Sequence, residues 1–139
     1  MRILVALALI AASLIPARAG VLDLVLPKLK TFPQCHETKV LKEIVERFNW
    51  AEEHTWHRGL YMDGVFDAHE STTHPAGRRQ IPRRYCRAQA ALSDGSHRRV
   101  FYMIEGGQGF AGTHHNVAWC ISSLDPWREY GSGCRVLRY

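Results

Sequence analysis

Four cysteines restrict the fold of this 139-residue chain more than any other feature of its sequence. Their number is even, the chain is short, and no CxxC pair is present. In an exported protein such a set predicts two disulfides, because the compartment outside the cytoplasm is oxidising. The alternative is free or metal-bound thiols, although the missing CxxC pair argues against a zinc ribbon or a thioredoxin-type site. The four residues are Cys35, Cys86, Cys120 and Cys134.

The N-terminus has the pattern of a secretory signal peptide. Arg2 supplies positive charge, residues 3–15 form an apolar run, and residues 17–19 make a small-x-small cleavage site. The apolar run is too short to span a bilayer, and the alternative is a retained N-terminal anchor. We therefore expect a signal peptide at 1–19 and, at 20–139, a single domain without a transmembrane segment.

Residues 35–56 carry the apolar periodicity of an amphipathic helix. Val40, Ile44 and Phe48 recur at i, i+4 and i+8, while charged residues occupy the opposite side. Gly59 is expected to end this helix, because glycine readily adopts the left-handed backbone of a helix C-terminus. Beyond it the apolar period becomes two, which is typical of strands. We expect a strand over 59–70, a loop over 71–82, a hairpin over 83–107, and strands over 116–124 and 134–139.

One long N-terminal helix followed by four to five antiparallel strands is an α+β fold. The most economical arrangement is a curved sheet wrapped around the helix and held by disulfides, as in cystatin-like or NTF2-like proteins. This comparison concerns architecture alone and implies no function.

Asp94 and Gly95 predict a two-residue hairpin turn, because both central positions of that turn need a positive φ. The register that follows places Arg87 opposite Tyr102. One face of the hairpin then carries Cys86 with the small alanines, where a helix can pack closely. The other face carries Arg83, Tyr85, Arg87, Gln89, Arg98, Val100, Tyr102 and Ile104.

This register also bears on the disulfide pairing. Cys35 lies at the start of the helix and Cys86 on the face that the helix covers, so we pair these two. We pair Cys120 with Cys134 across the loop between two strands. The rival pairing joins Cys86 to Cys120 and Cys35 to Cys134, and it remains open.

Charge collects in one band of the sequence. Residues 78–99 hold seven arginines and only one acid, Asp94. A local field of this kind attracts a partner more effectively than net charge does, and arginine and tyrosine are common at interfaces. We expect a non-enzymatic binding module that contacts an envelope protein or an anionic envelope polymer, not a nucleic acid. The expected contact residues are Arg83, Tyr85, Arg87, Arg98 and Tyr102, with Phe110 as a second candidate.

The stretch GGQGFAGT at residues 106–113 is not a phosphate loop. No lysine follows its glycines, and the next element is predicted to be a strand and not a helix. We expect a bulge or wide turn in which glycines take positive φ, with an exposed loop around Phe110 as the functional alternative.

Metal binding and catalysis are the alternatives to partner binding. The chain has eight histidines, and imidazole binds zinc and copper, but their spacing matches no specific metal motif. No G-x-S-x-G nucleophile motif is present, and oxidised cysteines cannot act as thiolate nucleophiles. A cavity between helix and sheet would allow a small-ligand carrier or acid–base chemistry by a histidine and a carboxylate. We predict no cofactor, metal ligand or catalytic residue.

Three segments resemble a group of short, uncharacterised exported bacterial proteins. They are RFNWAEEHTWHRG, DGSHRRVFYMIEGGQGF, and WCISSLDPW with CRVLR. The resemblance covers most of the chain after the leader. It implies a bacterial protein of the periplasm, or a secreted one, with the cysteines retained, and it implies no activity.

Overall fold

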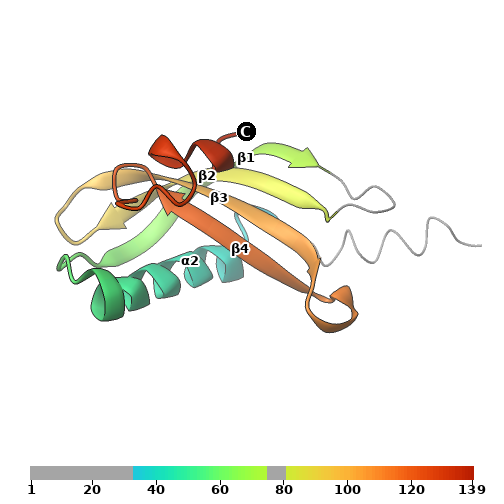
Figure 1. Cartoon of the computed structure of the whole chain (residues 1–139), viewed down its shortest axis with the longest axis horizontal. Coiled ribbons are helices and arrows are strands. Elements are labelled where there is room, and N and C mark those ends of the chain that lie inside the picture. The colour runs from blue at the N-terminus through green and yellow to red at the C-terminus, as the bar shows by residue number, and fades with distance from the viewer. Residues whose placement is uncertain (1–32, 75–80) are drawn as a thin grey trace, which may run out of the picture.

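The computed structural model describes residues 33–74 and 81–139, and these residues form one helix and one antiparallel sheet (Figure 1). The predicted signal peptide at 1–19 lies outside the described residues. In the described part of the chain, no helix is long and apolar enough to cross a membrane. The elements are α2 (Thr38–Ala51), a π-helical turn (Glu52–Trp56), β1 (Met62–His74), β2 (Arg83–Leu92), β3 (His97–Gln108) and β4 (His114–Ile121), with short 3-10 helices at Phe110–Gly112 and Ser132–Leu137.

The α+β class is therefore confirmed, with the strands in the order β1-β2-β3-β4. The predicted amphipathic helix is also present, and Val40, Ile44 and Phe48 form its buried stripe. Two details differ. The helix begins at Thr38, so it is not N-terminal in the chain. It ends in the π-helical turn, and His57 rather than Gly59 supplies the left-handed C-cap, with φ 50°.

The hairpin between β2 and β3 corrects the predicted register. Its loop has three residues, Ser93, Asp94 and Gly95, and only Gly95 takes a positive φ, 78°. The Gly95 N–H donates to the Leu92 carbonyl at 2.9 Å, and the Leu92 N–H donates to the Ser96 carbonyl at 3.0 Å. This is a type I turn followed by a left-handed residue, the usual three-residue hairpin.

The extra loop residue shifts the pairing by one position. Cys86 lies opposite Tyr102, and Arg87 lies opposite Phe101. Since strand side chains alternate between the two faces, a shift by one moves every β3 side chain to the other face. Tyr102 and its neighbours at i±2 therefore point toward α2, and Phe101 points away from it.

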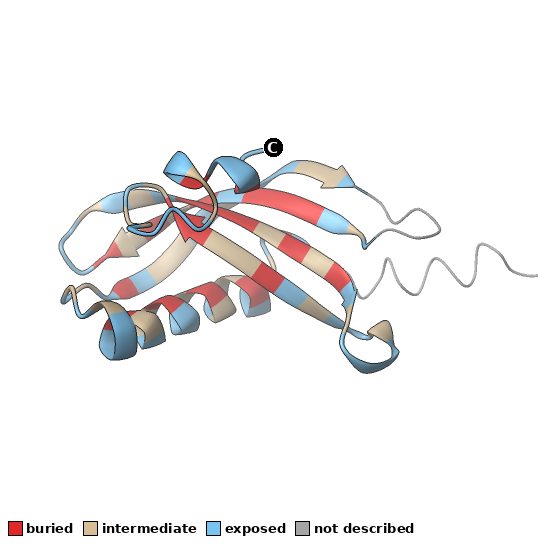
Figure 2. Cartoon of the chain, in the orientation of Figure 1, coloured by how far each residue is buried: buried red, intermediate tan, exposed pale blue. Residues whose placement is uncertain are grey.

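The main core lies between α2 and the sheet (Figure 2). Its side chains come from the helix stripe, from β2 with its small alanines, and from the face of β3 and β4 that the register turns toward the helix. The largest fully buried side chains include Phe48, Ile44, Met62, Tyr102 and Ile104.

The C-terminal segment covers part of the opposite face of the sheet (Figure 1). Phe101 and Cys120 pack there against Cys134 and Leu137. The predicted last strand at 134–139 is wrong, because Ser132–Leu137 is a 3-10 helix. Gly133 and Cys134 both have positive φ, 60° and 62°, and that backbone cannot continue as a strand.

Both predicted disulfides are confirmed, and each serves one face of the sheet. Cys35–Cys86 joins the segment before α2 to β2 on the helix side. Cys120–Cys134 joins β4 to the C-terminal segment on the other side. The two bridges thus attach the outer layers to the central sheet independently of each other.

Tyr102 links the core to the first disulfide. Its hydroxyl donates to the Cys35 carbonyl at 2.8 Å, and burial raises the pKa of the Tyr102 hydroxyl. Because the pKa is raised in the folded state, the unfolded chain ionises more easily. The stabilisation is complete below the ordinary tyrosine pKa of about 10, and it is lost as the pH rises above that value.

We expect Tyr102→Phe to lower the free energy of unfolding by about 1 kcal/mol near neutral pH, because the Cys35 carbonyl loses its donor. The alkaline loss of stability should also be smaller in the variant. It should not vanish, since burial, followed by the charge of Glu129, also raises the pKa of Tyr130. Urea unfolding at neutral and alkaline pH measures both effects, and an unchanged alkaline loss would contradict this assignment.

Candidate functional site

The predicted contact face does not assemble as one surface, and its two tyrosines are not available to a partner. Tyr102 is fully buried on the helix side of the sheet, as a result of the shifted register. Tyr85 lies on the outer side but is only 7 % exposed. Its ring lies 4.7 Å from that of Tyr139, at the chain end, and 5.7 Å from that of His74.

The three predicted arginines are also separated. Arg83 forms an ion pair with Glu105, with Nε 2.9 Å from the carboxylate. Arg98 points to the helix side and donates to the hydroxyls of Ser96 and Ser123, at 3.1 and 3.0 Å. Arg83 and Arg87 are both exposed on the outer face, but of these two only Arg87 has no ion pair to any described residue.

The outer face also holds Arg99, which the predicted register had placed on the helix side, and the C-terminal segment over this face adds further arginines. Arg87 on β2 and Arg99 on β3 flank Phe101, since Arg87 is paired with Phe101 and Arg99 is two residues away on the same face. The guanidinium of Arg138 lies 5.7 Å over the Phe101 ring. Arg135 adds a fourth exposed guanidinium from the C-terminal segment. We call Arg87, Arg99, Arg135 and Arg138 the arginine face.

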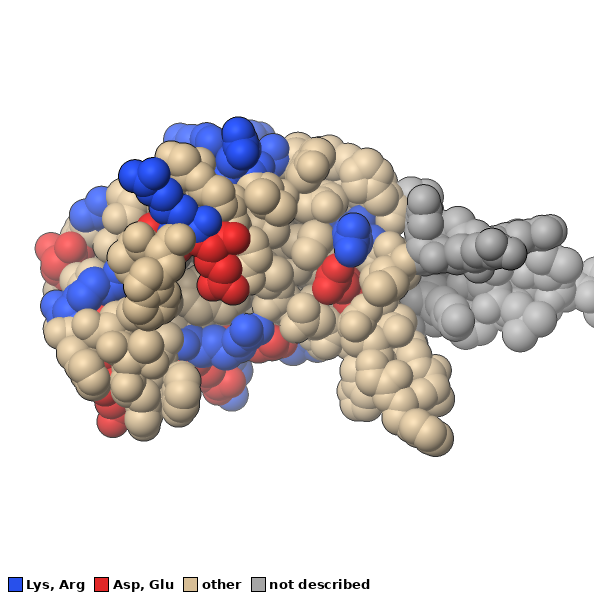
Figure 3. All heavy atoms as spheres, in the orientation of Figure 1, with Lys and Arg blue, Asp and Glu red and all other residues tan. Residues whose placement is uncertain are grey.

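None of these four arginines forms an ion pair within residues 33–74 and 81–139. The described arginines that do form ion pairs with carboxylates are Arg47, Arg58, Arg83 and Arg84. In Figure 3 the basic side chains gather along the side of the molecule that carries the C-terminal segment. The arginine face is therefore a basic surface whose charge the described part of the protein does not neutralise.

Phe110 lies apart from this surface. The predicted bulge is confirmed, because the β3–β4 pairing shifts between Glu105 and Gln108 and Gly107, Gly109 and Gly112 have positive φ. Phe110 is 94 % exposed in the loop that follows. Figure 1 places this loop at the far end of the β3–β4 hairpin from the C-terminal segment. The two predicted contact regions therefore do not form one site.

A second site, which the sequence reasoning missed, is a cleft between the end of α2, β4 and the loop after β4. Its volume is about 500 Å³. Trp50, Trp56, Trp119 and Tyr130 supply its aromatic lining. The remaining tryptophan, Trp127, has its ring 6.4 Å from that of Trp56. All four tryptophans of the chain thus lie in or beside this tryptophan cleft.

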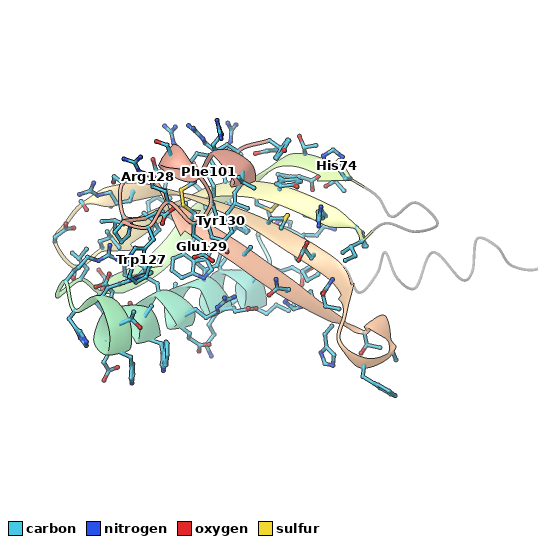
Figure 4. All side chains as sticks on the ribbon, viewed as in Figure 1. His74, Phe101, Trp127, Arg128, Glu129 and Tyr130 are labelled. Carbon is cyan, nitrogen blue, oxygen red and sulfur yellow. A yellow bond between two sulfur atoms is a disulfide. The ribbon has the colours of Figure 1, made fainter. Side chains whose placement is uncertain are left out.

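Each part of the cleft has a local structural cause. Trp50 stands outside the buried helix stripe and is 61 % exposed. Trp119 is paired with Tyr102, so it points to the helix side and packs against Phe48 at 6.0 Å. The π-helical turn brings Trp56 within 6.2 Å of Trp119, edge to face. Figure 4 shows Trp127, Glu129 and Tyr130 between the loop after β4 and α2.

A buried ion pair lies next to the cleft and contacts two of its lining residues, Trp56 and Leu124. Glu52 is only 5 % exposed, and it accepts from Nε of Arg58 at 2.8 Å and from the Arg58 backbone N–H at 3.2 Å. The same guanidinium donates to the Leu124 carbonyl at 3.0 Å and lies 4.5 Å over the Trp56 ring. One side chain thereby joins the π-helical turn to the loop after β4.

The charged lining of the cleft is mainly acidic. Glu46, Asp125 and Glu129 contribute carboxylates, and Arg47 is the cation among the lining residues. Arg47 is already engaged, because it donates to the Val117 carbonyl at 2.6 Å and to Glu43 at 3.3 Å. The cleft is therefore aromatic and carries an excess of negative charge.

The described residues do not form a site for either alternative function, metal binding or acid–base chemistry. Among the described residues, no group of three or more His, Cys, Asp or Glu is placed to hold a metal ion. His–carboxylate ion pairs occur between His69 and Asp67, at 3.5 Å, and between His115 and Glu43, at 3.6 Å. None of these four residues lines the tryptophan cleft.

No protein-family model, curated protein or solved structure matches this chain.

Proposed function

We propose that this chain is an exported, non-catalytic binding module whose arginine face contacts an anionic polysaccharide of the cell envelope. One observation carries the proposal: three exposed arginines lie beside or over the Phe101 ring, and Arg135 is exposed in the same C-terminal segment as Arg138. None of these four arginines has an ion pair among the described residues. Guanidinium groups bind carboxylate, sulfate and phosphate through paired hydrogen bonds. Their unneutralised field would also raise the local concentration of a polyanion.

A polymer fits this face better than an acidic protein does. Protein interfaces need a buried apolar or aromatic centre. The ring at the centre of the arginine face, Phe101, is only 7 % exposed and is already covered by the C-terminal segment. The face thus offers dispersed charge rather than an apolar anchor, which suits a repeating anionic chain.

Two further features support the proposal. Two disulfides fit an oxidising compartment, which agrees with the predicted signal peptide and with a periplasmic or secreted bacterial protein. One helix packed on an antiparallel four-stranded meander is compatible with a cystatin-like or NTF2-like architecture, which we retain as part of the proposal. That architecture carries no activity by itself.

The test is the binding of fluorescently labelled heparin, a sulfated and carboxylated polysaccharide, to the chain from residue 20, with neutral dextran as the control polymer. We expect salt-sensitive binding to heparin and none to dextran. Arg87→Gln with Arg99→Gln should weaken binding about tenfold or more, since one charge-assisted hydrogen bond contributes about 1.5 kcal/mol.

Arg83→Gln with Arg98→Gln is the matched control, because it removes the same charge outside the arginine face. It should retain most of the affinity. Equal losses in both double variants would mean that net charge, rather than this face, drives binding, and the proposal would then be wrong. Failure of the unaltered protein to bind heparin would also overturn it.

A further inference from the structure

We propose that the tryptophan cleft is a binding site for a small organic cation, best a quaternary ammonium group. The inference is independent of the arginine face, because it concerns other side chains and the opposite charge. It rests on the shape of the cleft, its aromatic lining and the sign of its charge.

The cleft has the size and lining of a small-molecule site. Its volume of about 500 Å³ lies within the usual range for such pockets, about 300–1,000 Å³. Such sites are lined mostly by apolar and aromatic groups, with a few polar groups that orient the ligand. Here three indoles and one phenol form the lining, and they come from α2, the π-helical turn, β4 and the loop after β4.

The charge of the lining selects a cation over a neutral or anionic ligand. The cleft is lined by three carboxylates and one guanidinium. That guanidinium already donates to a backbone carbonyl and to Glu43. The acidic surroundings are also evident at Tyr130, where burial and then the charge of Glu129 raise the pKa of the hydroxyl. An anion entering this cleft would meet uncompensated negative charge.

The hydrogen-bonding state of the carboxylates favours a quaternary over a primary ammonium. Asp125 already accepts from the Glu129 backbone N–H at 3.2 Å, and Glu46 is paired with Lys42 at 3.5 Å. Neither Asp125 nor Glu129 forms an ion pair with a described residue, so two of the three lining carboxylates keep an unneutralised charge. A primary ammonium needs several acceptors, whereas a quaternary ammonium needs none and binds ring faces through cation–π attraction.

One of the lining indoles, Trp56, already contacts a cation of the protein. The guanidinium of Arg58 lies over the Trp56 ring at 4.5 Å, so this indole has a cationic neighbour within the protein. The exposed ring of Trp50 has no such partner among the described residues, and it stacks against the His54 ring at 4.6 Å. Trp50 is therefore the ring on which we expect a ligand cation to make the largest difference.

The test compares choline with 3,3-dimethyl-1-butanol, its neutral isostere, by titration calorimetry on the chain from residue 20. Intrinsic fluorescence gives a second readout, because all four tryptophans lie in or beside the cleft. We expect choline to bind about tenfold more tightly than the isostere, and Trp50→Ala to weaken choline binding about fivefold or more. Equal affinity for the two compounds, or no binding of choline, would overturn the proposal.

Glu129→Gln should weaken choline binding, while Glu53→Gln is the matched control. Both carboxylates are exposed, and Glu53 does not line the cleft. Equal weakening in both variants would show a general effect of charge and would overturn the proposal. The double variant Arg87→Gln with Arg99→Gln should leave choline binding unchanged. The heparin and choline experiments therefore test the two proposals separately.

Discussion

Replacing Cys35 and Cys86 by alanine is expected to lower the free energy of unfolding by about 4 kcal/mol. The disulfide closes a loop of sequence separation 51, and its removal gives the unfolded chain more conformational freedom. It also frees the segment whose carbonyl accepts from Tyr102. Guanidinium unfolding followed by far-ultraviolet circular dichroism measures the loss.

The second disulfide provides the comparison. Cys120 and Cys134 are separated by 14 residues, so replacing both should cost about 3 kcal/mol. The larger difference should lie in where the structure loosens. Loss of the first bridge should increase amide hydrogen exchange in α2, and loss of the second should increase it in the C-terminal segment. Equal loosening of both layers in either variant would contradict their independent attachment.

Arg58→Ala is expected to be the most destabilising change of a charged residue, with a loss of about 3 kcal/mol or more, because it leaves the Glu52 carboxylate buried without its cation. It also removes the donor to the Leu124 carbonyl and the contact over Trp56. Thermal and urea unfolding measure the loss, and tryptophan fluorescence should report an altered cleft.

Two further variants separate these causes. Adding Glu52→Gln to Arg58→Ala should restore part of the stability, since the buried charge is then absent. Lys42→Ala breaks the exposed pair with Glu46 and should cost less than about 0.5 kcal/mol. If Arg58→Ala were as mild as Lys42→Ala, the buried pair would not be stabilising the contact between the π-helical turn and the loop after β4.

Much of the fold could be predicted from local patterns. The stripe of Val40, Ile44 and Phe48, with apolar neighbours at i+1 and i+5, has the period of a helix and not of a strand. The small residues beside Cys86 indicate where that helix packs. Those two inferences together were enough to pair the cysteines correctly. The register error did not affect the predicted Cys35–Cys86 disulfide, because the face on which Cys86 lies depends on β2 alone and not on its partner strand.

The contact face was mispredicted for a single physical reason. Asp-Gly favours both two-residue and three-residue hairpin loops, and the sequence does not distinguish them. The choice of a two-residue loop displaced β3 by one position, which put Tyr102 on the surface and Phe101 in the core. The same error turned Arg99 toward the helix side. Arg135 and Arg138 were missed because they lie in and directly after a 3-10 helix with left-handed residues, which sequence periodicity does not predict.

The tryptophan cleft was missed because its members are distant in sequence. Trp50 and Trp56 are six positions apart, and Trp119 and Trp127 are in another part of the chain. The available signal was compositional, since four tryptophans are many for a chain of this length and one of them, Trp119, directly precedes a disulfide cysteine. Their convergence depends on the π-helical turn, which amphipathic periodicity does not predict.

The segment at 124–138 belongs to both surfaces at once. It supplies Asp125, Glu129 and Tyr130 to the cleft, and Arg135 and Arg138 to the arginine face. A ligand that repositions this segment at one surface therefore alters the other, and thermodynamic reciprocity makes the two affinities change by the same factor. Heparin titrations with and without saturating choline would measure that factor. The Cys120–Cys134 disulfide restrains the segment and would therefore limit the coupling between the two binding sites.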